Sequence, residues 1–599
     1  MNIDTSTVFQ TIRNFGASDG WSTQHIGLHF PENKKERLAE LLFSRDTFPD
    51  GTPKGIGLSA WRFNIGAGTA EQGDESRISV ETRRTECFLN PDMKTYNWNK
   101  QAGQQWFLEK AAKTYQVENI IGWQNSPPVY FTVRGLGFRE YGDPVSTILK
   151  QEHYHDFGRF LADVVSHFKQ EGIHLKYISP LNEPQWGWAP SEAGGTVTQE
   201  GTPWTNQEIY EVVQAIDSEF NKQNTDAQLF IGEAGSINYL LAGSSGHAAN
   251  QLATFWDAGS PQSLVGLEYF SDYVSSHSYG TDGSANNIIS ARQQLKEQME
   301  EKDPSLEYWQ TEYCLLGNGY KWGHTDGMNR SLSPMESAIS MCRIIHSDLT
   351  VADCTGWQWW TTFESETLLG QEDRYALIRY LLNNEKSDGV YRPAKLLYAL
   401  GNYSRFVRPG MKRIGITRSD DATPGESLTG QMFSAYVDEQ KKNVVVVAVN
   451  ASTSERIIRF NETESLADVK AFVPYVTTDR EGDNLKKYPP VKPGEGFTLP
   501  GTSVVTFVGG TLDVNTAVRE KPADISLNVY PNPVANTLTV RAGAAIERLY
   551  LYDLSGRELQ AFSPRTLTFS FDTKGLHPGV YILRVDSGGN IQSVKIVKR

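Results

Sequence analysis

Two glutamates, each at the end of a short apolar run, are the residues of this sequence best suited to chemistry. Residues 177–186 read Tyr-Ile-Ser-Pro-Leu-Asn-Glu-Pro-Gln-Trp, a β-capable run whose tip carries Asn182 and Glu183. Residues 306–313 have the same design and contain Glu312. A pair of carboxyl groups can cleave an acetal, because one protonates the leaving oxygen while the other attacks or stabilises the anomeric carbon. The pair can act only if the fold brings both strand ends to one place.

Short runs of this kind alternate with longer amphipathic segments between residues 13 and 405, which is typical of βα units and a parallel sheet. The expected strands are 13–17, 61–66, 119–124, 177–182, 228–232, 274–278, 307–312 and 356–360. The expected helices include 34–44, 101–115, 153–171, 206–222, 285–301 and 334–350. The alternation predicts an α/β fold, a (β/α)8 TIM barrel over residues 12–405 with its chemistry at the carboxyl ends of the strands. Three βα units of about 40 residues each fit between the glutamates, which places Glu183 on the fourth strand and Glu312 on the seventh.

Beyond residue 405 the pattern changes to strands without helices. Strands are expected at 431–437, 443–450, 456–460, 469–476 and 502–508. They predict an antiparallel β-sandwich side domain over 406–510, which the β-like segment 1–11 completes. A polar linker, 511–524, then leads to a C-terminal unit, 525–599, whose alternating apolar and turn residues predict a compact Ig-like β-sandwich.

Composition limits the possible partners. The 599 residues favour three domains, and the net charge of -14 argues against binding to nucleic acid or an anionic membrane. No run approaches the roughly 20 apolar residues of a membrane span. Residues 1–10 lack the features of a signal peptide, so the chain as given is cytoplasmic or already trimmed. We expect a monomer.

Cysteine and aromatic residues add two further points. The four cysteines show no metal-type spacing and are expected to be buried thiols. Aromatic residues make up 11% of the chain, including 14 Trp and 26 Tyr. They serve either a large core or the binding of sugar rings, whose apolar C–H faces pack on aromatic side chains.

The C-terminal unit carries specific motifs along its whole length. These are Leu-Asn-Val-Tyr-Pro-Asn-Pro at 527–533, Leu-Tyr-Leu-Tyr-Asp-Leu-Ser-Gly-Arg at 549–557, Gly-Val-Tyr-Ile-Leu-Arg-Val at 579–585 and Ser-Val-Lys-Ile-Val-Lys-Arg at 593–599. The unit closely resembles the C-terminal sorting domain of cargo of the type IX secretion system of Bacteroidetes. The resemblance implies a secreted or cell-surface protein, the type IX secretion machinery as partner, and a tail that is processed off. The alternative is an ordinary Ig-like carbohydrate-binding or spacer module.

The barrel also resembles a known family. Asn-Glu-Pro at 182–184, with Glu312 at the next strand end but two, resembles the clan of (β/α)8 retaining glycosidases. Phe-Gly-Ala-Ser-Asp at 15–19, Asn-Ser-Pro-Pro at 125–128 and Phe-Val-Arg-Pro-Gly at 406–410 narrow the resemblance to glycoside hydrolase family 30. The resemblance implies that Glu183 is the acid/base and Glu312 the nucleophile. The chemistry requires Glu183 to hold a proton while Glu312 is ionised.

Other site residues follow from the same resemblance. Asn182 would hydrogen-bond the sugar 2-OH, unless it is only a turn residue. His277 and Tyr279, at the end of the sixth strand, would lie beside the nucleophile. Arg62 would hold Glu312 ionised, the alternative being a buried ion pair elsewhere.

Aromatic and further acidic residues complete the expected site. Trp360, in the run 357–360, would form an aromatic floor, and Trp186 and Trp204 would form extended subsites. Glu233, at the end of the fifth strand, is expected to touch substrate. Asp19 and Glu364, in loops on the same face, are weaker rivals as binding residues.

No cofactor or metal is expected, because His153 and His155 lack a nearby third ligand and no Gly-rich phosphate loop follows a strand. The glucosidase branches of the family carry Asp-Phe after the second strand, whereas residues 65–70 supply no acid here. Likeness is greatest to the endo-β-1,6-galactanase branch, which implies β-linked arabinogalactan side chains as substrate. The alternatives are a β-1,6-glucanase, a xylan-active enzyme, a glycan-binding protein without activity, or a surface adhesin.

Overall fold

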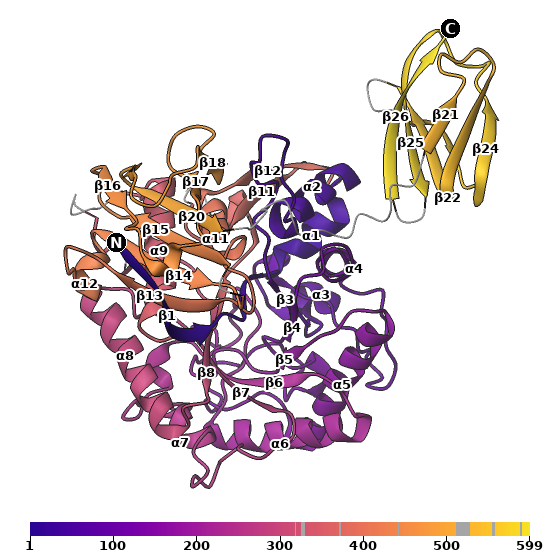
Figure 1. The fold of residues 1–599 in the computed structure, drawn as a ribbon. Helices are drawn as coiled ribbons and strands as arrows, with labels where there is room; N and C mark the ends of the chain where they lie inside the picture. Colours follow the sequence, from indigo (N-terminus) through magenta and orange to yellow (C-terminus); the bar gives the residue numbers. More distant parts are fainter. Residues whose placement is uncertain are drawn as a thin grey trace. The chain divides into compact units, whose positions relative to one another are not determined.

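The computed structural model describes residues 1–510 and 527–599, apart from 318, 325–329, 370–372, 441, 554–557 and 588–589. The expected linker 511–524 lies outside the described residues. The chain divides into two compact units, Met1–Leu512 and Asp513–Arg599 (Figure 1). Each unit is described by itself.

The larger unit contains a closed barrel of parallel strands. In barrel order these are β2 (Asn14–Ser18), β3 (Ala60–Asn64), β4 (Asn119–Trp123), β5 (Tyr177–Ser179), β6 (Gln228–Ala234), β7 (Phe270–His277), β8 (Glu307–Glu312) and β9 (Gly356–Trp359). The barrel closes where β2 pairs with β9. The predicted TIM barrel is confirmed. β5 ends before Pro180, earlier than predicted, because proline has no N–H to donate to the neighbouring strand.

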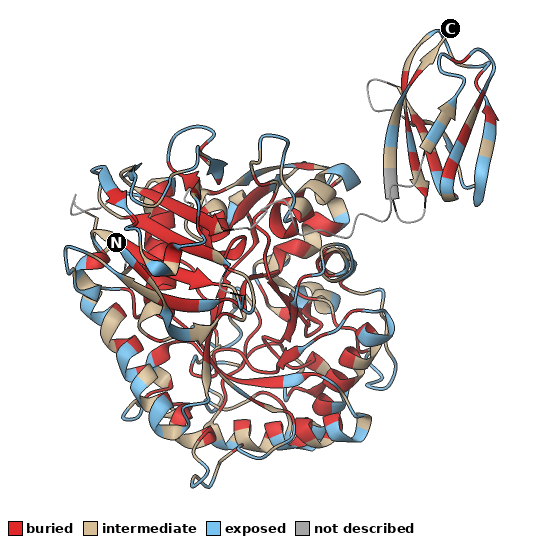
Figure 2. Ribbon diagram, in the orientation of Figure 1, coloured by how far each residue is buried: buried red, intermediate tan, exposed pale blue. Residues whose placement is uncertain are grey.

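Helices cover the outside of the barrel. The predicted ones appear as α2 (Glu32–Phe43), α4 (Ala102–Glu109), α5 (Tyr154–Gln170), α6 (Asn206–Gln223), α8 (Ala285–Lys302) and α9 (Pro334–Thr350). Further helices are α1 (Ser22–His29), α3 (Thr69–Gln72), α7 (Gln251–Phe255), α10 (Glu366–Leu369), α11 (Lys395–Ser404) and α12 (Pro424–Ser427). A capping box between Thr205 and Glu208 starts α6, and another between Ser333 and Glu336 starts α9. The barrel strands are almost entirely buried, while the helices around them expose their outer faces (Figure 2).

The two-residue period of the strands sorts the barrel interior into layers. Ala60, Ile121, Tyr177, Phe230 and Trp309 form one apolar cluster. Moving two residues along a strand brings the next side chain to the same face, one layer nearer the carboxyl end. The apolar layer therefore supports polar side chains above it, at the mouth. A small sheet of β10 (Phe363–Ser365), β11 (Ile378–Leu382) and β12 (Gly389–Pro393) follows the last barrel strand.

A seven-stranded antiparallel sheet packs beside the barrel. Its order is β1 (Asn2–Thr11), β13 (Lys412–Thr417), β14 (Gln431–Val437), β15 (Asn443–Asn450), β20 (Ser503–Gly510), β17 (Phe472–Thr477) and β18 (Lys486–Lys487). A second layer pairs β16 (Arg456–Arg459) with β19 (Gly496–Leu499). The N-terminal strand β1 thus lies in the same sheet as the strands that follow the barrel.

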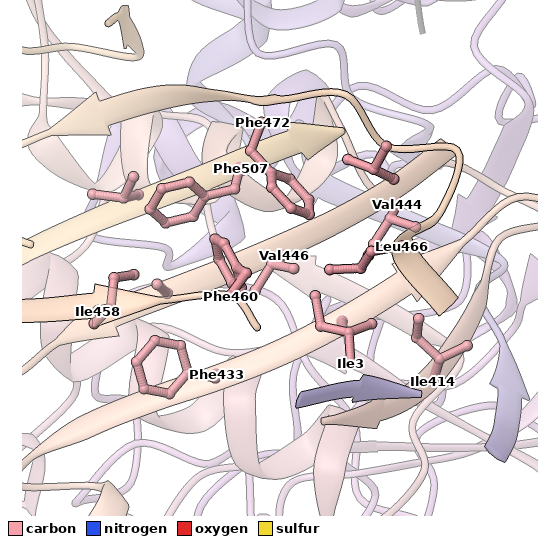
Figure 3. Packing of buried hydrophobic residues seen from close by; sticks show 14 of the residues in the cluster. Ile3, Ile414, Phe433, Val444, Val446, Ile458, Phe460, Leu466, Phe472 and Phe507 are labelled. Atoms are coloured by element: carbon pink, nitrogen blue, oxygen red, sulfur yellow. The ribbon is translucent and has the colours of Figure 1, made fainter. Parts of the chain in front are cut away.

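The core of this side domain is aromatic and aliphatic. Phe460 packs on Phe472 and Phe507, with ring centroids 4.6 and 5.1 Å apart (Figure 3). Ile3 from β1 belongs to the same cluster. On the other side, the buried Asn402 of α11 donates to the Tyr475 carbonyl oxygen at 3.0 Å, which ties the sheet to the barrel.

The C-terminal unit is all β. It contains β21 (Leu527–Tyr530), β22 (Thr537–Tyr552), β23 (Glu558–Phe562), β24 (Thr566–Asp572), β25 (Gly579–Ser587) and β26 (Asn590–Lys598), paired antiparallel. Its core includes Val540, Leu549, Phe571, Leu583 and Ile596. Among the helices of the described residues, none has the length and apolar character needed to cross a membrane. The four cysteines are buried free thiols.

Candidate active site

The carboxyl ends of the barrel strands bring five ionisable side chains into one buried cluster. Glu183 follows β5, Glu233 lies in β6 and Glu312 is the last residue of β8. Arg62 lies in β3, and His277 is the last residue of β7. All five are buried. The strand order therefore places Glu183 and Glu312 at the same mouth, Glu183 in the loop after the fourth barrel strand and Glu312 at the end of the seventh.

Arg62 joins the cluster through both ends of its guanidinium group. Its Nη1 donates to Glu312 Oε2 at 2.7 Å, and its Nη2 donates to Glu233 Oε2 at 2.9 Å and to Asn182 Oδ1 at 3.1 Å. The guanidinium carbon lies 4.2 Å from the centroid of the Trp123 ring, in a cation–π contact. Arg62 is thus held in one orientation, which fixes Glu312 and Asn182 relative to each other.

His277 and Tyr279 contact the two facing glutamates. His277 Nδ1 lies 3.0 Å from Glu183 Oε1 and 3.7 Å from Glu312 Oε1, and its Nε2 lies 3.4 Å from Glu233 Oε2. The Tyr279 hydroxyl donates to Glu312 Oε1 at 3.1 Å. Burial raises the pKa of Tyr279 well above its ordinary value, so the hydroxyl keeps the proton that it donates.

The pKa values of the cluster reflect burial opposed by charge. Burial alone would lower the pKa of His277, but Glu312, Glu183 and Glu233 together raise it to about 10. Burial alone would raise the pKa of Glu233, but Arg62 and His277 hold it below its ordinary value. For Glu312, burial is the larger effect and raises the pKa, although His277 and Arg62 both oppose it. Arg62 therefore favours the ionised form of Glu312 without outweighing its burial.

The backbone is strained at two of the three carboxyl residues. Glu183 has φ of 45° and Glu233 has φ of 41°, in the left-handed region that costs a non-glycine residue about 1–3 kcal/mol. The Glu183 N–H donates to the Glu233 carbonyl oxygen at 2.9 Å, and the Glu233 N–H donates to Ser275 Oγ at 3.1 Å. These two hydrogen bonds stabilise the left-handed backbone conformation of both residues.

A cavity of about 220 Å³ opens beside the two glutamates. Its lining residues are Asn125, Asn182, Glu183, Trp186, Gln199, Tyr279, Glu312, Leu316, Trp360 and Tyr375. A larger hollow of about 430 Å³ lies at the other end of β8, beside Arg13 and Glu307, and contains none of these residues. The smaller cavity is the candidate active site, because Glu183 and Glu312 both line it.

Two indoles give the cavity an aromatic wall. Trp360 packs edge-on against Trp21 and Trp123, and its Nε1 donates to the Tyr375 hydroxyl at 3.1 Å. Trp186 leaves 38% of its surface exposed at the rim and packs edge-on against Tyr239. An aromatic face at the rim can bind a sugar ring beyond the cavity.

Not every expected residue reaches the cavity. Trp204 is fully buried, so the prediction that it forms a subsite is wrong. Glu233 is also fully buried and lies outside the lining, where it binds Arg62 and His277 instead. Aromatic content in a loop does not say which indole faces solvent, and a strand-end acid can equally serve as a buried counterion.

The two rival acids are likewise enclosed. Asp19 is buried and accepts from the Asn64 N–H and from Gln104. Glu364 is buried and accepts from Ser22 and Arg83. Neither lines the cavity.

Three polar lining residues were not among the expected site residues. Asn125 is part of the 125–128 motif, and its place in the loop directly after the third barrel strand was the available signal. Gln199 and Tyr375 lie in long loops, and nothing in their sequence surroundings marks them as lining residues.

The cluster also resembles a metal ligand set in one respect. Glu183, His277 and Glu312 place potential ligand atoms within 4.8 Å of one another. In this structure the same atoms form ion pairs, with His277 Nδ1 3.0 Å from Glu183 Oε1 and 3.7 Å from Glu312 Oε1.

Comparisons with known proteins agree with this geometry. A family model described as O-Glycosyl hydrolase family 30 matches residues 1–368. A model described as a secretion system C-terminal sorting domain matches residues 528–599. The matches cover the barrel and the C-terminal unit, respectively.

Individual proteins are also similar to this chain. The chain is 26% identical over 375 residues to glucuronoxylanase XynC of Bacillus subtilis (strain 168), which covers 62% of this chain and 70% of that protein. It is 24% identical over 253 residues to an endo-beta-1,6-galactanase of Hypocrea rufa, covering 40% of this chain and 51% of that protein. Among solved structures, a conserved exported protein from Bacteroides fragilis is 32% identical, with a TM-score of 0.76 over 85% of this chain and 99% of that chain.

Proposed function

The chain belongs to glycoside hydrolase family 30, and on that premise we propose that it is a retaining β-glycosidase that cleaves β-1,6-linked galactan within arabinogalactan side chains. Its C-terminal type IX sorting domain makes it a secreted or cell-surface protein. Its partners in this role are the type IX secretion machinery and a β-linked polysaccharide.

The observation that carries the retaining mechanism is the separation of the two carboxyl groups. An oxygen of Glu183 lies within 4.8 Å of an oxygen of Glu312. Retaining glycosidases hold their carboxyl groups about 5–5.5 Å apart, whereas inverting ones leave about 6.5–9.5 Å for a water molecule. The short separation supports direct attack on the sugar by one of the two residues.

The hydrogen bonds of Glu312 support the proposed division of roles. Glu312 accepts from Arg62 and Tyr279, which orient it and favour the ionised form that a nucleophile needs. Glu183 then donates a proton to the glycosidic oxygen while Glu312 bonds to the anomeric carbon and the leaving alcohol departs. In the second step Glu183 takes a proton from water, the water oxygen bonds to the anomeric carbon, and Glu312 is released. Asn182, held by Arg62, would bind the sugar 2-OH.

Two observations favour a polymer over a simple glucoside. Residues 65–70, which follow the second barrel strand, supply no acid. Trp186 is exposed at the rim, where it can bind a further sugar unit. The similarity to an endo-beta-1,6-galactanase supports β-1,6-galactan as the polymer. The similarity to a glucuronoxylanase supports a xylan-active enzyme as the second candidate.

Product profiling tests the substrate. The purified protein is incubated with β-1,6-galactan, β-1,6-glucan and glucuronoxylan, and the released oligosaccharides are separated and identified. The proposal expects β-1,6-galactooligosaccharides and little release from the other two polymers. Preferential release of oligosaccharides from xylan or glucan would show that galactan is not the substrate. Binding to these polymers without release from any of them would contradict the enzymatic function.

Azide rescue tests the two roles. Glu312→Gly removes the nucleophile, and azide can then attack the anomeric carbon from the vacated side. The expected product from a β-linked substrate with a good leaving group is an α-glycosyl azide, identified by its NMR coupling constants. A β-glycosyl azide would contradict the assigned roles, because it would mean that Glu312 is the acid/base.

A further inference from the structure

Asn125 stands out among the lining residues because its side chain has no partner. It is 2% exposed, it lines the catalytic cavity, and neither its Oδ1 nor its Nδ2 has a hydrogen-bond partner among the described residues. Leaving a buried polar group unpaired costs about 1–3 kcal/mol, and most such groups in folded proteins are paired. A buried amide that faces a substrate cavity with both atoms free is suited to pair with the substrate.

Asn125 lies in the loop that follows β4. Ile121 belongs to the apolar layer of the barrel, and Trp123, the last residue of β4, packs against Arg62 and Trp360. Asn125 lies two residues beyond Trp123 and lines the cavity. Pro127 and Pro128 follow it and restrict the backbone of this loop.

Asn182, the other asparagine in the lining, is already engaged. Its Oδ1 accepts from Arg62 at 3.1 Å, which orients the amide. Two further lining residues are held so that each keeps a donor. Gln199 Oε1 accepts from Arg83 Nη1 at 3.4 Å, which leaves its NH2 group to donate. The Tyr375 hydroxyl accepts from Trp360 Nε1 at 3.1 Å, which leaves its own proton to donate.

Asn125 can therefore offer one donor and one acceptor side by side, a pattern that matches two neighbouring hydroxyl groups on a sugar ring. No Lys or Arg is among the described residues that line the cavity, so nothing there would neutralise a sugar carboxylate. We propose that Asn125 is a specificity-determining residue, which holds a neutral sugar in the cleavage subsite by hydrogen bonds to two adjacent hydroxyl groups. The proposal rests on the β-glycosidase function proposed above.

A set of single-deoxy substrates tests this role. The parent is the smallest β-linked oligosaccharide that the full chain cleaves, and each analogue replaces one hydroxyl of the sugar on the non-reducing side of the cleaved bond by hydrogen. For the unaltered protein, loss of either of two adjacent hydroxyls should lower kcat/KM about 10- to 100-fold, because the analogue leaves a buried polar atom of Asn125 without a partner.

The variant Asn125→Leu removes both hydrogen-bonding atoms at similar volume. It should lower kcat/KM for the parent oligosaccharide by a similar factor and show no further loss with those two deoxy analogues. The matched control is Gln124→Leu. Gln124 is also a buried amide with both side-chain atoms unpaired, but it does not line the cavity. The control should keep the full sensitivity to every deoxy position.

Thermal unfolding and a second variant guard against a folding defect. If Asn125→Leu does not fold, Asn125→Ala removes the same two hydrogen-bonding atoms without adding volume or charge, and it should likewise show no further loss with the two deoxy analogues. Unchanged sensitivity to every deoxy position in a folded Asn125 variant would overturn the proposal. Failure of the unaltered protein to cleave any β-linked oligosaccharide would overturn the proposed function instead, so the two failures are distinct.

Discussion

Replacing Arg62 with methionine tests the electrostatic account of the site. The substitution keeps an unbranched apolar stem and removes the guanidinium group that donates to Glu312 at 2.7 Å, to Glu233 at 2.9 Å and to Asn182 at 3.1 Å. All four residues are buried, so solvent does little to replace the lost cation. Glu312 then keeps His277 as its nearest positive group, at 3.7 Å.

The size of the effect follows from the shortest contact. Opposite unit charges at the 2.7 Å separation of Arg62 and Glu312 attract by about 6 kcal/mol at an effective dielectric constant near 20, which is an upper limit. An adjacent arginine typically lowers a carboxyl pKa by about 1–3 units. Removing Arg62 should therefore raise the pKa of Glu312 by about 1–3 units. Because Glu312, the proposed nucleophile, must be ionised, the acidic limb of the kcat/KM profile should move to higher pH by the same amount.

Replacing Arg62 should also lower the stability of the protein. A second buried ion pair separates this loss of stability from the change in the pKa of Glu312. Removing one partner of a buried ion pair costs about 3–5 kcal/mol of unfolding free energy. Arg292 of α8 donates to Asp348 of α9 at 2.6 Å, and both side chains are fully buried. Arg292→Met should therefore destabilise the protein by a similar amount and leave the acidic limb in place.

The assay is kcat/KM from about pH 3 to 9 on one soluble substrate, with urea unfolding of each variant at pH 7. An Arg62→Met profile whose acidic limb coincides with that of the unaltered protein would refute the electrostatic role. Equal limb shifts in the Arg62 and Arg292 variants would also refute it, because the shift would then report lost stability. Arg62→Lys keeps the charge but loses the planar fork, so its limb should shift less than that of Arg62→Met.

Three further outcomes are expected. Burial raises the pKa of Glu200 to about 7. Between pH 4.5 and 7 the unfolded chain has therefore lost a proton that the native state keeps, so the free energy of unfolding falls as pH rises. Relative to the unaltered protein, Glu200→Gln should gain up to about 3 kcal/mol across that window in urea unfolding, and a constant difference would contradict this. Tyr279→Phe removes the hydroxyl that donates to Glu312 and should lower kcat/KM about tenfold with an upward shift of the acidic limb; an unchanged profile would exclude its role. Trp186→Ala should raise KM for polymer roughly two- to tenfold and leave an aryl monoglycoside unaffected, whereas equal losses on both substrates would show that Trp186 acts on the site itself.

The barrel could be predicted because each strand is a short apolar run bounded by turn residues, a pattern that burial imposes directly on the sequence. Glu312 is the last residue of β8, as predicted, whereas β5 ends at Ser179, because Pro180 interrupts the ladder that the apolar run suggested. The lining could be predicted less well. Trp186 and Trp204 look alike in sequence, and only packing exposes the first and encloses the second.

Charge balance in the cluster gives the proposed proton cycle a physical basis. Arg62 and protonated His277 supply two positive charges, which two ionised carboxyl groups would match. A third carboxylate would leave one buried negative charge uncompensated, which a site of low dielectric strongly disfavours. The proposed acid step needs one proton on a facing glutamate, and this charge balance favours it. Once the sugar is bound covalently to Glu312, that negative charge is gone, and Glu183 can remain ionised with the balance restored. The same two cations therefore fit both roles proposed for Glu183, the acid of the first step and the base of the second.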